Sequence, residues 1–335
     1  MYSPMAKFQR FYGQPRTSRS DQILLLTDCT EELYQTIISE IKETYPQIEV
    51  VYSASQQTLY VSTICCEIGE TVSKYVADTL GGLLNYRVID FDSHLLFAYM
   101  TMPSPFVVKS CVVPPNDLMI LRYSEDREVS TTVHAGRVFF EWGYLRHYKQ
   151  LMTKIKLHAS TDKSNLPVTI FLTLVDESPK FEIPEIDFAE ELNYAAQMQD
   201  FTDTILNYRF RYSYRGIIRN IEYYGQQWFG ELTSCLIHVY RYYPELKTLA
   251  LLRCIDCLEW LKTCEGKVKL DVDLHLNDAL LSDMIPHPRR SFGNPWIPLS
   301  LEQCLLVENI NIAISTTAIS RFEKLLKHHT GEGEE

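Results

Sequence analysis

The first hundred residues alternate between two hydrophobic periods, one typical of helices and one typical of strands. Apolar residues at helical spacing predict one helix from about Asp28 to Thr44 and another from Glu70 to Leu84. Shorter β-rich runs flank these helices and predict strands over residues 22–27, 48–53, 58–64 and 86–100. The order β-α-β-β-α-β is that of the split βαβ motif. We therefore expect an α+β protein with a βαββαβ, ferredoxin-like unit over residues 21–110.

Beyond this unit the pattern predicts two further regions. Residues 111–185 are expected to mix strands with a short helix. Residues 186–330 are expected to form a central helical block followed by C-terminal strands and a terminal helix. The elements predicted in this last region are helices at 187–208 and 245–264, strands at 267–276 and 303–314, and a helix at 317–329.

The two ends of the chain have the composition of flexible segments. Residues 1–20 are basic and contain two prolines and a glycine, which predicts a flexible arm. The alternative for this arm is an organelle transit peptide, but it lacks a clear amphipathic helix. Residues 331–335 form a short acidic tail.

The run Asn207–Trp228 combines an apolar stripe with a cationic, aromatic face when it is placed on a single helix. The polar face of this helix is formed by Arg211, Arg215 and Arg219, with Tyr208 and Tyr212 beside them. Guanidinium groups pair bidentately with phosphates, and tyrosine rings stack on bases, so this face suits single-stranded nucleic acid. The structural alternative is that the rings pack against other helices and the arginines pair with some of the 43 acidic residues.

A second segment, residues 286–296, repeats the combination of cationic and aromatic side chains. Arg289 and Arg290 precede Trp296 in a stretch stiffened by prolines. Aromatic and arginine side chains are enriched at binding surfaces, so this loop is a candidate to assist the face at 207–228. The alternative is a loop that Trp296 packs onto the core.

Composition and charge limit what such faces can do. Hydrophobic residues make up 46% of the 335 residues and charged residues 22%, which is typical of a globular chain. The net charge of −11 excludes a general polyanion binder, so any nucleic-acid contact must come from a local patch. No apolar run is long enough for a transmembrane helix or for the core of a signal peptide, so no membrane contact is expected.

The nine cysteines indicate a reducing compartment. Their number is odd, and most lie within apolar periodic segments, as expected for thiols used as small core residues. Cytoplasm or nucleus is therefore expected. Cys254, Cys257 and Cys264 fall on one stripe of the predicted helix 245–264 without a second ligand pair, so we expect no zinc site and no cofactor.

The strand predicted at 267–276 carries the best candidates for catalysis. Asp271, Asp273 and His275 are spaced two apart, so a strand places them on one face, where they could hold a divalent metal for phosphoryl transfer. The alternative is the solvated face of an ordinary alternating strand. No phosphate-binding loop, dinucleotide fingerprint or nucleophile elbow is present in the sequence.

These observations lead to three hypotheses of function. The first is a non-enzymatic binding and assembly protein that engages single-stranded RNA and self-associates through the terminal helix 317–329. The second is a protein-interaction subunit of a larger complex without nucleic-acid contact, and the third is a metal-dependent phosphoryl-transfer enzyme.

Overall fold

The computed structural model shows a mixed α+β fold, as the sequence predicts. The residues that it describes are 6–8, 23–44, 49–53, 56–62, 66–88, 95–99, 106–108, 111–113, 118–123, 129–130, 138–159, 168–182, 194–212, 216–263, 267–273 and 296–330.

The helices and strands follow one another in a mixed order. Up to residue 130 they are β1 (Ile23–Leu26), α2 (Glu31–Thr44), β2 (Glu49–Ser53), β3 (Thr58–Ser62), α3 (Glu67–Val88), β4 (Leu95–Tyr99), β5 (Phe106–Val108), β6 (Cys111–Val113), β7 (Leu118–Tyr123) and β8 (Val129–Ser130). From there they are β9 (Val138–Tyr144), the 3-10 turn η2 (Leu145–His147), α4 (Tyr148–Ala159), β10 (Val168–Ser178), α5 (Tyr194–Tyr212), β11 (Ile221–Tyr223), β12 (Gln226–Phe229), β13 (Glu231–Tyr243), β14 (Thr248–Asp256), α6 (Cys257–Thr263), β15 (Lys267–Asp273), β16 (Trp296–Glu302) and α8 (Gln303–Thr330).

Four strands form the central sheet in the order β14-β13-β10-β9. β10 is antiparallel to β13 and parallel to β9, and the parallel pair is connected through η2 and α4. A parallel pair needs a crossover of this kind because the chain must return to the end of the sheet where it started. β14 is antiparallel to β13 and forms the outer strand of the sheet.

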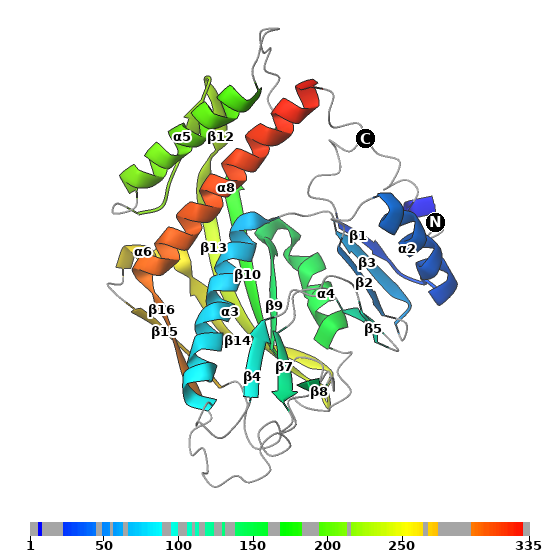
Figure 1. The fold of residues 1–335 in the computed structure, drawn as a ribbon. Helices are drawn as coiled ribbons and strands as arrows, with labels where there is room; N and C mark the ends of the chain where they lie inside the picture. Colours follow the sequence, from blue (N-terminus) through cyan, green and yellow to red (C-terminus); the bar gives the residue numbers. More distant parts are fainter. Residues whose placement is uncertain are drawn as a thin grey trace.

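The sequence of β13 explains why helices cover both faces of this sheet. Residues 235–242 read CLIHVYRY, with apolar side chains at odd and even positions, as expected for a strand buried on two sides. Cys235, Ile237 and Val239 join the main core with α3 and α8, whereas Tyr240 and Tyr242 pack with α4. We call these two sides the α3/α8 face and the α4 face (Figure 1).

The main core lies on the α3/α8 face and takes residues from Cys66 to Leu326. The ring of Phe322 on α8 lies at its centre, stacked on Phe201 of α5 with 4.3 Å between ring centroids and perpendicular to Trp228 of β12. The three regions expected from the sequence, 21–110, 111–185 and 186–330, therefore all contribute to this core.

A second sheet of five strands, in the order β1-β3-β2-β6-β5, is covered by α2. The side chain of Tyr60 on β3 is fully buried and packs with Leu157 of α4, so α4 lies between the two sheets (Figure 1). Phe8, within the expected flexible arm, is fully buried in the core under α2. The rest of that arm and the acidic tail lie outside the described residues.

The order of elements expected over the first hundred residues is confirmed. However, β4 pairs with β7 in a separate three-stranded sheet with β8. A ferredoxin-like pairing, in which the fourth strand joins the first sheet, is not seen among the described residues.

Much of the expected helical block is instead β structure. The predicted helix at 245–264 is β14 followed by the short α6, because Asp256 caps a new helix there with its side chain. Conversely, the predicted strand at 303–314 belongs to the long helix α8. For α8, only the second half was predicted as a helix, namely the terminal helix at 317–329.

The single helix predicted over Asn207–Trp228 is also wrong. α5 ends at Tyr212, and the chain then forms the hairpin of β11 and β12. The hairpin turn has positive φ at both central residues, 51° at Tyr224 and 67° at Gly225, which is the geometry of a two-residue type I′ turn.

Among the described residues, no helix is long and apolar enough to cross a lipid bilayer.

Candidate binding surface at the edge strand

β14 is exposed on the outside of the central sheet to a degree that is unusual for an apolar strand. It reads TLALLRCID, and most of its residues are exposed. Leu251 is 52% exposed and Leu252 37%, and Leu246, in the turn before the strand, is 69% exposed. No strand pairs with its outer side among the described residues. The surface formed by the turn 244–247 and β14 is called the β14 edge below.

The start of β14 is set by the turn that links it to β13. The amide of Lys247 donates to the carbonyl of Pro244 at 3.2 Å, and Lys247 has a positive φ of 50°. The reversal carries the chain back along β13, with which β14 pairs. The sequence therefore closes a hairpin whose second strand has only one neighbour.

A β-bulge divides the β14 edge into two halves. Val239 of β13 pairs with Arg253 and Tyr240 pairs with Leu251, so Leu252 is the extra residue. A bulge bends its strand and locally disrupts the ladder, which is one way in which proteins limit pairing at an exposed edge. The residues available for a regular added ladder are therefore Thr248–Leu251 and Arg253–Asp256.

Three polar side chains on the α4 face, from α4 and from β13, contact one another beside β14. The Tyr148 and Tyr240 hydroxyl oxygens are 2.6 Å apart, and His238 Nδ1 lies 3.2 Å from the Tyr240 oxygen. Burial, followed by the bond to Tyr148, raises the pKa of Tyr240, while burial lowers the pKa of His238. Both groups are thus held neutral at pH 7.

The cysteines at this end of the sheet are not arranged for catalysis or metal binding. Burial and then the nearby Asp256 raise the pKa of Cys254, which lies opposite His238 in the β13–β14 pair. A hydrogen bond with Cys235 and then burial raise the pKa of Cys257 well above its usual value. Thiols held protonated in this way are poor nucleophiles and poor metal ligands. Cys264 lies outside the described residues.

The structure separates the residues expected to form an Arg/Tyr face. Arg211 is exposed in the last turn of α5, whereas Arg219 lies in the loop before β11 and pairs with Glu231 at 3.2 Å. Tyr208 and Tyr212 are half-buried, and Tyr212 packs against the main core. Arg215 lies outside the described residues. A continuous helical face is therefore not formed, because the helix that would carry it ends at Tyr212.

The other candidates of the sequence are only partly described. Asp271 and Asp273 lie on β15, with Pro298 and Trp296 of β16 opposite them. His275, Arg289 and Arg290 fall outside the described residues. No group of three or more metal-ligating side chains comes together in the described part of the chain.

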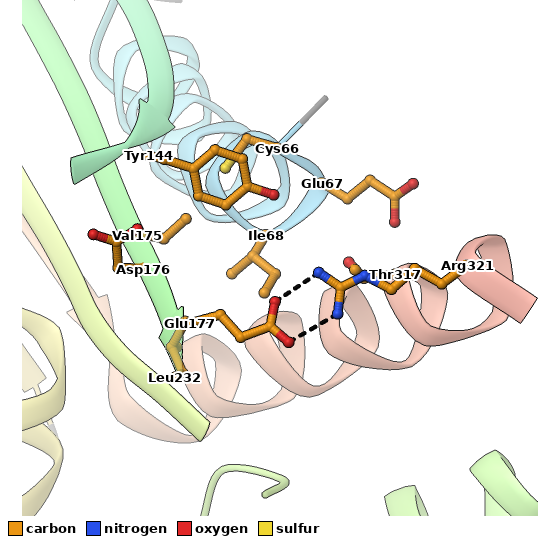
Figure 2. Close-up of a pocket in the computed structure, with 10 residues that line it drawn as sticks. All are labelled: Cys66, Glu67, Ile68, Tyr144, Val175, Asp176, Glu177, Leu232, Thr317 and Arg321. Atoms are coloured by element: carbon orange, nitrogen blue, oxygen red, sulfur yellow. Dashed lines mark hydrogen bonds and ion pairs between the residues drawn. The ribbon is translucent and has the colours of Figure 1, made fainter. Parts of the chain in front are cut away.

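A pocket at the junction of α3, β10 and α8 is occupied by a structural ion pair (Figure 2). Arg321 donates to both carboxylate oxygens of Glu177, at 2.8 Å and 2.6 Å, and to the carbonyl of Trp228 at 2.9 Å. The guanidinium also lies over the ring of Phe181. Because Glu177 further accepts from the amide of Gly230 at 3.0 Å, both charges are already satisfied. The ion pair in this pocket links β10 to α8.

No protein-family model, no curated protein and no solved structure matches this chain.

The sequence-based interpretation missed the β14 edge because residues 245–264 were assigned to a helix. The sequence did contain signals of a strand followed by a capped helix. They are a proline before the segment, the uncharged run TLALL directly before Arg253, and an aspartate before Cys257.

Proposed function

We propose that this protein is a protein-interaction subunit that binds an extended segment of a partner protein by adding it as a strand to the β14 edge. The observation that carries this proposal is the exposed, apolar outer strand of the central sheet. An unpaired edge offers backbone N–H and C=O groups in the spacing of a strand, and exposed leucines beside it offer apolar contact area.

Charge favours a partner segment that carries an acidic residue. Arg253 is exposed near the middle of the edge, and no carboxylate of the described residues pairs with it. The one acid of β14, Asp256, accepts hydrogen bonds from the amides of Leu258 and Glu259 at 2.9 Å and 3.1 Å, since it caps α6. Within the ladder, a second copy of β14 would therefore offer only this capping carboxylate, and Glu245 lies in the turn outside the strand, which favours a different protein as the partner.

The structure gives less support to the other functions expected from the sequence. Single-stranded nucleic acid was expected on one helix face, and that helix ends before Arg215 and Arg219. Self-association was expected through the terminal helix, whose apolar residues Phe322, Leu325 and Leu326 are buried in the main core. Both remain predictions, and each is an outcome of the experiment below.

The proposal is tested by selecting peptides of about twelve residues from a random display library against the whole protein. We expect apolar peptides with one acidic residue, and we expect their binding to protect the backbone amides of Thr248–Asp256 from hydrogen exchange. Affinity should fall at least tenfold in the double variant Leu251→Lys, Leu252→Lys. The variant Leu206→Lys, which changes a leucine of α5 that is as exposed as Leu251, should bind within about threefold of the unmodified protein.

The proposal is overturned if no peptide is selected, or if the protected amides lie elsewhere in the protein. Two parallel measurements separate the alternatives. A concentration-dependent dimer whose β14 amides are protected without peptide would assign the edge to self-association. Salt-sensitive binding of a labelled single-stranded RNA that is lost in Arg211→Glu, Arg219→Glu would support the nucleic-acid function instead.

A further inference from the structure

Arg241 of β13 is a cation buried within the central sheet. Its side chain is only 4% exposed, and its Nε and Nη2 atoms have no hydrogen-bond partner. Among the described residues no carboxylate forms an ion pair with it. Arginine is almost never fully buried unless it is paired, because an isolated charge loses its hydration without compensation.

The position of Arg241 departs from the pattern of its strand. Cys235, Ile237 and Val239 precede it at alternate positions on the α3/α8 face, and all three are fully buried apolar residues of the main core. Arg241 takes the next position on that face, opposite Thr169 of β10, which is also buried. Packing alone would favour another apolar residue here, so a polar requirement at this position explains the sequence better than core formation does.

Other buried cations of the protein show how such a charge is normally neutralised. Lys154, which is 3% exposed, pairs with Glu141 of β9, and Arg321 binds Glu177 with both of its terminal nitrogens. Arg241 is 4% exposed, close to the 3% of Lys154, and no acid of the described residues pairs with it. The missing partner must therefore be supplied from outside the described part of the chain.

We propose that Arg241 is the binding residue of an anion site, and that its ligand carries two oxygens of a carboxylate or a phosphate group. The two unpartnered atoms, Nε and Nη2, form the side of the guanidinium group whose N–H bonds point in parallel. This fork matches the two oxygens of such an anion in a bidentate arrangement. Thr169, directly across the ladder, places a hydroxyl beside the same position.

The site is independent of the proposed binding of a partner at the β14 edge. The fork belongs to β13, inside the sheet, and lies two residues before this strand ends at Tyr243. A small anion would neutralise the buried charge and stabilise the folded protein in proportion to its occupancy.

The test measures the thermal unfolding midpoint of the whole protein during titration with sodium phosphate and, separately, with sodium acetate. Sodium chloride at matched ionic strength is the reference. We expect the midpoint to rise by about 2 °C over the reference when the anion reaches roughly ten times its dissociation constant. The rise should disappear in Arg241→Met and persist in Arg253→Met, which removes an exposed arginine of the neighbouring strand.

The two titrations distinguish the class of ligand, since a phosphate site responds to phosphate at concentrations at which acetate has no effect. The proposal is overturned if neither anion raises the midpoint above the chloride reference, or if Arg241→Met responds as the unmodified protein does. Should Arg241→Met not fold, Arg241→Lys keeps the charge without the fork and should lose most of the response.

Discussion

Single buried charges determine how tightly α4 is held against the central sheet. Lys154 projects from α4 to Glu141 of β9, and both side chains are more than nine-tenths buried. The mutual attraction of such a pair offsets the loss of hydration, but removing one partner leaves the other charge buried and unpaired. The pair therefore makes the α4 packing sensitive to single substitutions in a way that apolar neighbours are not.

The variant Lys154→Met should lower the free energy of unfolding by about 3–5 kcal/mol, because the buried Glu141 carboxylate loses this ion pair. The double variant Lys154→Met, Glu141→Leu should recover most of this loss. Chemical denaturation of the three proteins measures both effects. Equal stability of the single variant and the unmodified protein would show that water or another group neutralises Glu141.

His238 gives the α4 face a dependence on pH. Burial lowers its pKa below the usual 6.5, so the unfolded chain binds a proton at a higher pH than the folded protein does. This contribution to stability is complete above pH 6.5 and is lost as the pH falls through the lowered pKa. The groups that face the imidazole are the Tyr240 hydroxyl, the ring of Tyr148 and, across the ladder, Cys254.

We therefore expect the free energy of unfolding to decrease between pH 6.5 and pH 5 more steeply in the unmodified protein than in His238→Gln. The difference between the two pH profiles isolates this histidine from the other eight. Parallel profiles would contradict the expectation and indicate that the imidazole is protonated equally in both states.

At the scale of elements, α8 organises the chain that follows α5. The Asn311 side chain lies in the core, where its Oδ1 accepts from the amide of Ile218 at 2.9 Å and its Nδ2 donates to the carbonyl of Gly216 at 3.0 Å. One side chain of α8 thus satisfies two backbone groups of the loop that enters the β11–β12 hairpin.

Replacing this side chain in Asn311→Ala should lower the free energy of unfolding by about 1–3 kcal/mol, because the buried amide of Ile218 loses its acceptor. The matched variant is Asn309→Ala, whose side chain bonds only within its own helix, to the carbonyl of Leu305. We expect a change below about 0.5 kcal/mol there. Denaturant titration of both variants measures these changes. Equal losses of unfolding free energy in the two variants would contradict a stabilising role for the contact between Asn311 and the loop.

The same elements show which parts of the fold the sequence could reveal. Periodicity located α2, α3 and β1 to β4 because each of these carries one clear hydrophobic period between strong turn signals. Periodicity failed for Gln303–Ile314, where β-branched residues favour a strand but the apolar spacing also fits a helix. Packing against α3 stabilises the helix there. Periodicity also failed for Asn207–Trp228, because α5 ends at Tyr212 and the positive φ of Tyr224 and Gly225 turns the later part of this run into a hairpin.

The candidate surfaces were less predictable than the elements. The exposure of Leu251 and the isolation of Arg241 both depend on which strands lie beside β13 and β14, and strand order is not encoded in local periodicity. The sequence could show that Arg241 interrupts an apolar run. It could not show that no acid faces this residue.

For the whole molecule, α4 and α8 connect the parts. α4 packs on the central sheet through Leu151 and Ile155 and meets the second sheet through Leu157, while α8 joins α3, α5 and β12 in the main core. Neither sheet is complete without a helix that another part of the chain supplies, so we expect the described sheets to unfold together.

A deletion tests this dependence. Removing residues 315–335 takes Arg321 and Phe322 out of the core and should abolish cooperative thermal unfolding, with loss of soluble protein. Removing only 331–335 should leave the unfolding midpoint within about 1 °C, since these glycines and glutamates add no apolar side chain to a core. A folded, soluble product of the longer deletion would show that α8 is an accessory helix and would restore it as a candidate for self-association.

The central position of Phe322 also has a consequence for the order in which the protein folds. In a chain being synthesised, the helical layer on the α3/α8 face stays incomplete until the segment 303–326 has been made, because α8 packs beside α3 there. Contacts between residues so far apart in the chain form slowly, and the partly covered core is a target for aggregation in the meantime. Chaperone dependence during synthesis should therefore be high and should end abruptly once α8 docks.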